Sequence, residues 1–222
     1  MKAMILAAGR GSRLRPFTDR VPKPLVEIAG MPLIGHHLCR LAAVGIRDVV
    51  INVAYRGDQI QAALGDGQRY GVSIRYSEET PGALDTGGGI AQATSVLGTD
   101  DFLLVNADVL TDFDFRQLMS PSPGAGSGPG LTLALIDNPA HHRRGDFGLV
   151  DGRLRDIAPR LTYAGIGRFS PGLFAARAGE RFALTDIIQR AIQDGHAFGV
   201  HHPGRWIDVG RAATLARARQ IG

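Results

Sequence analysis

A glycine-rich loop with arginines is the first part of the chain whose residue types could do chemistry. The segment Ala8-Gly9-Arg10-Gly11-Ser12-Arg13 follows a short apolar run and continues to Thr18. Glycine lets a backbone approach a phosphate closely, peptide N–H groups can line a concave anion site, and guanidinium groups add charge-assisted hydrogen bonds. The segment therefore predicts a triphosphate-binding loop, with an ordinary strand-to-helix turn as the alternative.

Two other phosphate-binding motifs do not fit this loop. Leu14 stands where the third glycine of a dinucleotide-binding fingerprint should be, and the chain has no Gly-Lys-Ser or Gly-Lys-Thr of a Walker loop. A Rossmann dehydrogenase is therefore a disfavoured alternative.

Lys23 is the second residue of chemical interest. The chain has 25 Lys and Arg residues, and only Lys2 and Lys23 are lysines. Pro22 and Pro24 flank Lys23, restrict the backbone and disfavour a helix. A lysine in such an Arg-biased chain suits a place where a compact ammonium is needed and a planar guanidinium would not fit, although Lys2 shows that chance retention also occurs.

Two aspartates are candidates for a metal site. Asp108 ends the apolar run that begins at Phe102, so it should project from the carboxyl end of a strand, beside the phosphate loop. Asp208 lies between apolar neighbours, a hundred residues later. Two carboxylates, together with phosphate oxygens and waters, are a usual way for a protein to hold Mg²⁺. Either aspartate alone would more often be a helix cap or a turn residue.

Alternating strands and helices must position these residues. Short apolar runs predict strands over residues 3–7, 48–53, 72–76 and 102–106, and helical periodicity predicts helices over 32–44, 58–64 and 86–97. Asp85 or Thr86 is the expected cap of the third helix. Such an alternation is typical of βαβ units around a mainly parallel sheet, whose carboxyl strand ends share one edge.

The second half of the chain has a different pattern. Residues 120–130 are rich in Pro, Gly and Ser and are expected to form a flexible surface loop between residues 1–119 and 131–222 of a single domain. A strand over 131–136, a hairpin around Asp151-Gly152 and an apolar stretch over 163–169 indicate a more antiparallel part. Helices are predicted over 184–192 and 212–219.

Composition bounds the class of protein. The 222 residues are 44% hydrophobic and 21% charged, which is sufficient for one sizeable core. No run of eighteen apolar residues and no signal peptide occurs, so we expect a cytoplasmic protein without a membrane partner. Cys39 is the only cysteine, which excludes an intramolecular disulfide. The net charge of +4 lies on scattered arginines, a pattern that favours an anionic small substrate over nucleic acid.

Three adjacent histidine pairs lack the spacing of a metal site. They are His36-His37, His141-His142 and His201-His202, and we interpret them mostly as surface or helix residues.

The phosphate loop and Lys23 together resemble one enzyme family. The pattern G-x-G-x-R-x-x-P-x-T followed by P-K-P-L, typical of sugar-1-phosphate nucleotidyltransferases, matches the segment from Gly9 to Leu25. This resemblance implies an α/β fold: a three-layer Rossmann-like nucleotidyltransferase core with a mainly parallel sheet and a smaller antiparallel sugar-binding part. Residues 1–119 would then be the nucleotide-binding half and residues 131–222 the sugar-binding half. The substrates would be an NTP and a sugar 1-phosphate.

The resemblance also implies roles for particular residues. Arg13 would hold the NTP phosphates, Lys23 would bond phosphate oxygens during transfer, and Asp108 and Asp208 would bind Mg²⁺; these four are the catalytic candidates. The family has Gly-Asp where this chain has Ala107-Asp108. Residues 84–88 resemble the family's L-x-T-[GA]-G segment, which encloses the nucleobase. The full set of nucleotide-binding candidates is Ala8, Gly9, Gly11, Ser12, Arg13, Lys23, Glu78, Gly82 and Gly87.

Within the family, the sequence is most similar to the N-acetylmuramate 1-phosphate uridylyltransferases of peptidoglycan recycling. Segments around residues 138–147, 162–166 and 206–210 carry this similarity, which implies UTP and N-acetylmuramate 1-phosphate as substrates. The sugar-binding candidates are Asp146, Gly148, Tyr163 and Gly165, with Arg143 and Arg144 for the carboxylate of the sugar. The E-K-P motif of many relatives is missing. Mannose-1-phosphate guanylyltransferase, glucose-1-phosphate thymidylyltransferase and a non-catalytic nucleotide-sugar sensor remain alternatives, and the oligomeric state is not predicted.

Overall fold

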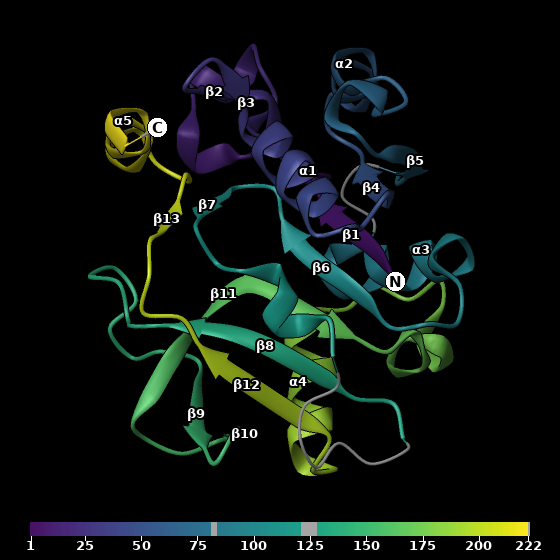
Figure 1. Cartoon of the computed structure of the whole chain (residues 1–222), viewed down its shortest axis with the longest axis vertical. Coiled ribbons are helices and arrows are strands. Elements are labelled where there is room, and N and C mark those ends of the chain that lie inside the picture. The colour runs from purple at the N-terminus through teal and green to yellow at the C-terminus, as the bar shows by residue number, and fades with distance from the viewer. Residues whose placement is uncertain (81–83, 121–127, 222) are drawn as a thin grey trace.

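A mixed sheet runs through the whole molecule (Figure 1). The computed structural model describes residues 1–80, 84–120 and 128–221. Within these residues the main sheet has the strand order β5-β4-β1-β6-β11-β8-β12-β10-β9. Its strands are β1 (Lys2–Leu6), β4 (Asp48–Val53), β5 (Ser73–Glu78), β6 (Phe102–Asn106), β8 (Leu131–Ile136), β9 (Phe147–Val150), β10 (Arg153–Arg155), β11 (Arg160–Phe169) and β12 (Ala197–His201).

The two halves of the sheet differ in strand direction. Strands β5, β4, β1 and β6 pair in parallel. Strand β11 is antiparallel to both β6 and β8, and β10 is antiparallel to β12 and β9. Strand β12 is parallel to β8, so the second half is mixed. The predicted α/β class, with a parallel first part and a more antiparallel second part, is confirmed.

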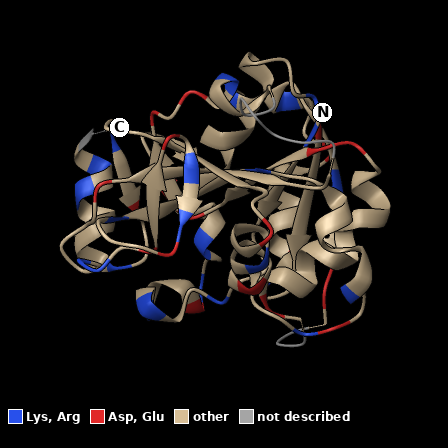
Figure 2. Cartoon of the chain, turned by 90° about the horizontal axis from the view of Figure 1, so that it is seen from below, with Lys and Arg blue, Asp and Glu red and all other residues tan. Residues whose placement is uncertain are grey.

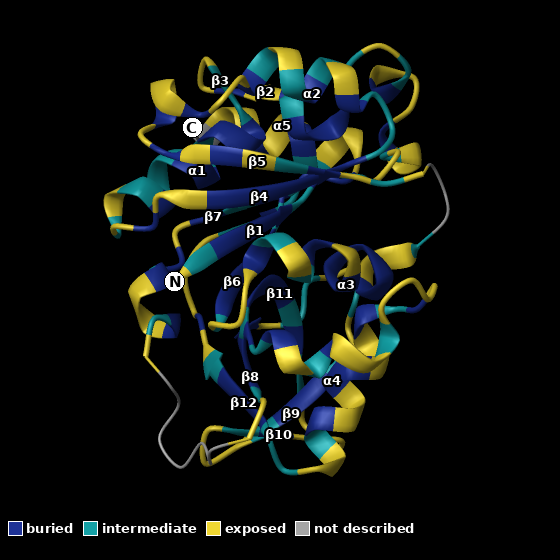
Figure 3. Cartoon of the chain, turned by 90° about the vertical axis from the view of Figure 1, so that its right-hand side faces the viewer, coloured by how far each residue is buried: buried dark blue, intermediate teal, exposed yellow. Residues whose placement is uncertain are grey.

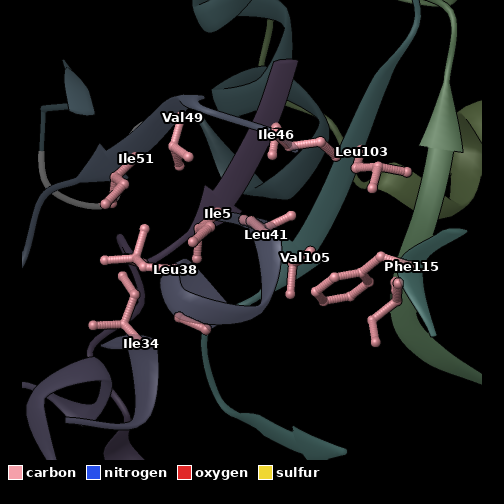
Figure 4. Packing of buried hydrophobic residues seen from close by; sticks show 14 of the residues in the cluster. Ile5, Ile34, Leu38, Leu41, Ile46, Val49, Ile51, Leu103, Val105 and Phe115 are labelled. Carbon is pink, nitrogen blue, oxygen red and sulfur yellow. The ribbon is translucent and has the colours of Figure 1, made fainter. Parts of the chain in front are cut away.

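Helices cover both faces of the sheet and make three layers (Figure 3). They are α1 (Leu33–Ala43), α2 (Gly57–Leu64), α3 (Asp85–Leu97) and α4 (Leu184–Gln193), whereas α5 (Ala212–Ile221) packs in a separate core with Ile28 and Ile207. Side chains of a strand alternate between its faces. In β1, Ile5 accordingly packs with Leu38 and Leu41 of α1 (Figure 4), whereas Met4 packs in a second core with residues of α3 and α4.

The start of α3 corrects one prediction. Leu84 is the N-cap residue of this helix and makes no capping hydrogen bond with its side chain. Asp85 is the first helical residue, with a φ of 59°, and its Oδ1 accepts a hydrogen bond of 2.6 Å from the backbone N–H of Thr86. The N-cap position therefore precedes both predicted cap residues.

Two small sheets complete the fold beside the main sheet. Strand β7 (Val109–Thr111) pairs with β13 (Trp206–Asp208), and β2 (Glu27–Ile28) pairs with β3 (Met31–Pro32). Arg40 of α1 fixes the turn after β7, because its guanidinium donates to the backbone oxygens of Thr111, at 2.6 Å, and Phe113.

Charged residues are distributed over the loops and helices (Figure 2). Lys and Arg lie on many separate segments, mixed with Asp and Glu, in agreement with the scattered arginines of the sequence. Among the residues that the structure describes, no helix is both long enough and apolar enough to cross a membrane. Most of the predicted flexible loop, and Gly82, lie outside those residues.

Candidate active site

The loop after β1 has a conformation that only glycine allows without strain. Gly11 has a φ of 66° and precedes the short 3-10 helix of residues Ser12–Leu14. A Cβ atom on Gly11 would lie 3.0 Å from Cγ2 of Thr18 and 3.1 Å from Cβ of Lys23. The hydroxyl of Thr18 donates a 3.0 Å hydrogen bond to the carbonyl oxygen of Gly11. The glycine thus lets the loop and Lys23 approach each other closely.

Lys23 is a buried cation between two carboxylates. The residue is 7% exposed and begins the 3-10 helix Lys23–Leu25. Its Nζ lies 2.5 Å from Oδ2 of Asp108 and 3.6 Å from Oδ1 of Asp208. A buried ammonium is stable only when paired in this way.

The small sheet β7–β13 brings the two aspartates together. Asp208 at the end of β13 is opposite Val109, the first residue of β7. The backbone N–H of Val209 also donates a 2.8 Å hydrogen bond to the carbonyl oxygen of Asp108. Arg13 reaches the same place, with one guanidinium nitrogen 3.4 Å from Oδ2 of Asp208. The four predicted catalytic residues therefore converge, although up to 195 positions separate them in the chain.

The donor set is compatible with Mg²⁺. Oδ1 of Asp208 is buried and has no hydrogen-bond partner. In the described part of the chain, no three side chains of His, Cys, Asp or Glu form a protein cage for a metal. Mg²⁺ typically binds one or two carboxylates together with substrate phosphates, so Asp108 and Asp208 suffice.

Gly210 is a site residue that the sequence did not reveal. A Cβ atom here would lie 2.8 and 2.9 Å from the two carboxylate oxygens of Asp208 and 3.0 Å from a guanidinium nitrogen of Arg13. The absence of a side chain therefore leaves room for this ion pair. Its position two residues after Asp208 was visible in the sequence, but the contact depends on the fold.

A cavity of about 890 Å³ extends from this cluster across the carboxyl ends of the parallel strands. Of the predicted nucleotide-binding residues, Ala8, Gly9, Gly11, Ser12, Arg13 and Lys23 line it. Arg10 of the predicted triphosphate loop lines it too, and further lining residues that were not predicted include Asn52, Tyr55, Glu79 and Arg181. Asn52 follows the rule for strand ends, since it lies on β4 next to the end of β1, and could have been found by that signal.

Two predicted nucleotide-binding residues lie elsewhere. Glu78 is exposed, accepts a 2.9 Å hydrogen bond from the side chain of Gln61, and is not among the residues that line the cavity. Gly87 packs against Phe182, whose carbonyl oxygen accepts its N–H at 2.9 Å. A Cβ on Gly87 would be 2.4 Å from the ring of Phe182, so this glycine serves helix packing.

Among the sugar-binding candidates, Asp146 and Tyr163 contact each other. The two carboxylate oxygens of Asp146 contact Nε2 of His142 and the backbone N–H of Tyr163, both at 2.8 Å. None of the six candidates lines the cavity described above. Gly165, with a φ of 74°, lies against Asn106, which does line it. The side chains of Arg143 and Arg144 are exposed and, among the described residues, have no hydrogen bond or ion pair.

Tyr163, a predicted sugar-binding residue, packs largely into the protein interior. Its side chain packs against the second core, and its hydroxyl is buried without a hydrogen-bond partner. Burial raises the pKa of this hydroxyl. A contact between Tyr163 and the sugar stays a prediction.

His202 departs from the interpretation of the histidine pairs as mostly surface or helix residues, whereas His37 is a helix residue that is buried. His37 lies in α1, as expected for a helix residue, but it is fully buried with both ring nitrogens unpartnered. Burial and the nearby Arg40 lower the pKa of His37 to about 4. His202 is buried and does not lie in a helix. Its Nε2 lies 2.9 Å from Oδ1 of Asp112.

Comparison with known proteins shows the family of this chain. The model of the nucleotidyl transferase family matches residues 2–221. The chain belongs to the nucleotidyl transferase family. It is 45% identical to N-acetylmuramate alpha-1-phosphate uridylyltransferase of Neisseria meningitidis serogroup B, over 100% of this chain and 98% of that protein. The identity to the enzyme of the same name from Caulobacter vibrioides is 34%, over 98% and 96% of the two chains.

A solved structure supports the fold of this nucleotidyl transferase. A putative glucose-1-phosphate thymidylyltransferase from Bacillus anthracis, in complex with a sucrose, superimposes with a TM-score of 0.87. The two chains are 23% identical, and the match covers 100% of this chain and 94% of the other. The likeness extends over both halves of the sheet.

Proposed function

We propose that this nucleotidyl transferase transfers UMP from UTP to N-acetylmuramate 1-phosphate, uses Mg²⁺ and releases pyrophosphate. The observation that carries the proposal is the cluster of Arg13, Lys23, Asp108 and Asp208, of which the first three line a cavity of about 890 Å³. The choice of uracil and muramate is supported by the 45% identity, over the full chain, to an enzyme of that name. The product would belong to peptidoglycan recycling.

The reaction needs charge neutralisation and alignment and no covalent intermediate on the protein. An oxygen of the sugar phosphate attacks the α-phosphorus of the NTP, the bond from that phosphorus to the bridging oxygen breaks, and pyrophosphate leaves with the electron pair. Mg²⁺, when held by Asp108 and Asp208, would supply positive charge to the phosphate oxygens. Arg13 and the peptide groups of the glycine loop would hold the triphosphate.

Lys23 would exchange partners when substrate binds. In the structure its ammonium is paired with Asp108 and Asp208, the same two carboxylates that would bind the cation. If those carboxylates held a cation, the ammonium would be available to the α-phosphate, and its burial between two prolines fixes where it lies. The two carboxylates therefore neutralise the buried ammonium of Lys23 until substrate phosphates take their place.

A pyrophosphate-release screen tests the proposal. Four NTPs are combined with N-acetylmuramate 1-phosphate, mannose 1-phosphate, glucose 1-phosphate and N-acetylglucosamine 1-phosphate, each with and without Mg²⁺. Release that is greatest with UTP and the muramate substrate and requires Mg²⁺ supports it. Preference for GTP and mannose 1-phosphate, or for dTTP and glucose 1-phosphate, replaces it with the corresponding alternative, and nucleotide binding without pyrophosphate release identifies a sensor.

A further inference from the structure

One cation of the cavity has no role in the reaction described above. Among the described residues, the cationic side chains that line the cavity are Arg10, Arg13, Lys23 and Arg181. The first three belong to the segment between β1 and α1 that would hold the triphosphate. Arg181 lies just before α4, and it and Gly210 are the described residues after position 130 that line the cavity. Because glycine has no side chain, Arg181 is the side chain by which the described part of the second half reaches the cavity.

Arg181 enters the cavity from the side opposite to the triphosphate loop. Leu14, next to Arg13, packs with Leu33 of α1 in one buried cluster, so this loop lies on the α1 side. Helices α3 and α4 pack together on the other face of β1 (Figure 3), in the core that contains Phe182. The cations of the cavity therefore lie on two walls, and Arg181 is on the wall that the triphosphate loop does not form.

The backbone on both sides of Arg181 is fixed against the start of α3. The N–H of Phe182 donates a 3.2 Å hydrogen bond to the carbonyl oxygen of Leu84. A Cβ atom on Gly88 would lie 2.3 Å from the carbonyl oxygen of Glu180, so the absence of a side chain lets α3 approach this segment closely. Leu84 itself lines the cavity. The position of Arg181 at this wall is thus set by the packing of the segment on α3.

The guanidinium of Arg181 is available to a substrate. The residue is exposed and, within the described ranges, forms no hydrogen bond or ion pair. The acids nearest in the chain are engaged by another arginine, since Arg177 pairs with Glu180 at 2.8 Å and with Asp186 at 3.4 Å. Asp85, which also lines the cavity, accepts a backbone N–H of its own helix at 2.6 Å. An anionic group of the substrate is therefore a suitable partner for Arg181.

The proposed substrates carry one kind of anion besides phosphate. The triphosphate of UTP is matched by the glycine loop, Arg13 and Lys23. The 1-phosphate of the sugar must approach the α-phosphorus for transfer, so it also lies beside that cluster. The lactyl group of N-acetylmuramate bears a carboxylate on the sugar ring, away from the 1-phosphate. A planar guanidinium fits such a carboxylate with two parallel hydrogen bonds.

We propose that Arg181 binds the carboxylate of the sugar substrate and so sets the preference for an acidic over a neutral sugar 1-phosphate. The inference rests on the proposed function, since it explains how the cavity takes a muramate substrate. It makes Arg181 a specificity-determining residue. Arg143 and Arg144, which the sequence offered for this carboxylate, do not line the cavity.

The lactyl methyl ester of the substrate isolates the charge, because it keeps the lactyl group and removes its negative charge. The kcat/KM of pyrophosphate release is measured with the acid and with the ester, for wild type and for Arg181→Ala. Wild type should prefer the acid by at least about tenfold, and Arg181→Ala by less than about threefold. Arg181→Lys should give an intermediate preference, because an ammonium keeps the charge without the planar fork.

Controls separate this role from an effect on the fold or on the nucleotide. The side chain of Arg181 is exposed, so thermal unfolding of Arg181→Ala should match wild type. Arg217→Ala makes the same change at an exposed residue of α5 that does not line the cavity, and it should keep the wild-type preference. The KM for UTP should stay within about twofold in Arg181→Ala, because the triphosphate is held at the other wall.

Three results would overturn the inference. One is an Arg181→Ala variant that prefers the acid as strongly as wild type, as expected if Arg143→Ala or Arg144→Ala removes the preference instead. Another is a wild-type enzyme that uses acid and ester equally. The third is a raised KM for UTP with an unchanged preference, which would assign Arg181 to the triphosphate. A failure of the proposed function looks different, because wild type would then release no pyrophosphate from UTP and N-acetylmuramate 1-phosphate in the substrate screen.

Discussion

Gly210→Ala should damage catalysis while leaving the fold intact. The backbone of Gly210 does not have a positive φ, so alanine can adopt its conformation. The new methyl group would lie 2.8 and 2.9 Å from the two carboxylate oxygens of Asp208, where ordinary contact begins at 3.4 Å. The carboxylate must therefore move by roughly 0.5 Å, and the guanidinium of Arg13, at 3.0 Å, must move as well.

The displacement sets the expected size of the effect. A misplacement of about 1 Å can cost about a hundredfold in rate, so a shift of roughly half that distance should lower kcat by about tenfold, or about 1.4 kcal/mol. The atoms that move are the ends of two side chains and not backbone. The free energy of unfolding should therefore change by less than about 1 kcal/mol.

A double-mutant comparison tests whether the loss passes through Asp208. Pyrophosphate release and thermal unfolding are measured for Gly210→Ala in the wild-type and the Asp208→Ala backgrounds. The second background has no carboxylate to displace, so the additional loss there should be smaller and should reflect only the displacement of Arg13. Titration of UTP gives the same comparison where turnover is too slow. Wild-type turnover in Gly210→Ala, or an equal loss in both backgrounds, would refute the reasoning.

Three further predictions concern the charged residues. Asp108→Asn and Asp208→Asn should each fold normally and lose at least about tenfold in turnover, because each removes charge at constant volume; near-wild-type rates at saturating Mg²⁺ would contradict the metal assignment. Lys23→Arg should lower kcat about tenfold, since a planar fork replaces a buried ammonium, and wild-type turnover would indicate a generic charge. Arg143→Ala or Arg144→Ala should shift the preference for N-acetylmuramate 1-phosphate over N-acetylglucosamine 1-phosphate by roughly ten- to a hundredfold in kcat/KM. Equal losses on both sugars, or none, would make this turn an ordinary charged surface.

The sequence predicted the parts of the site that depend on local spacing. Lys23 between two prolines and Asp108 after an apolar strand follow from backbone restriction and from the rule for parallel strand ends. The site roles of these residues stay predictions. The sequence could not show which of two successive residues at a strand end faces the cavity, because such residues point to opposite sides. Glu78 was the predicted residue, but Glu79 lines the cavity. Likewise, Gly87 and Gly89 look equivalent in the sequence but contact different elements.

The third hydrophobic core explains how the site can draw on both ends of the chain. Leu14, next to Arg13, packs in one buried cluster with Ile207 and Val209, the two neighbours of Asp208. Leu215 and Ala218 of α5 belong to the same cluster. Exposed ion pairs contribute little by themselves, and Arg13 is more than half exposed at its side chain. The apolar neighbours, which are buried, therefore hold Arg13 and Asp208 within reach of each other. Substitutions that open this core, such as Leu14→Ala, should consequently weaken triphosphate binding, although the substituted side chain itself contacts no phosphate.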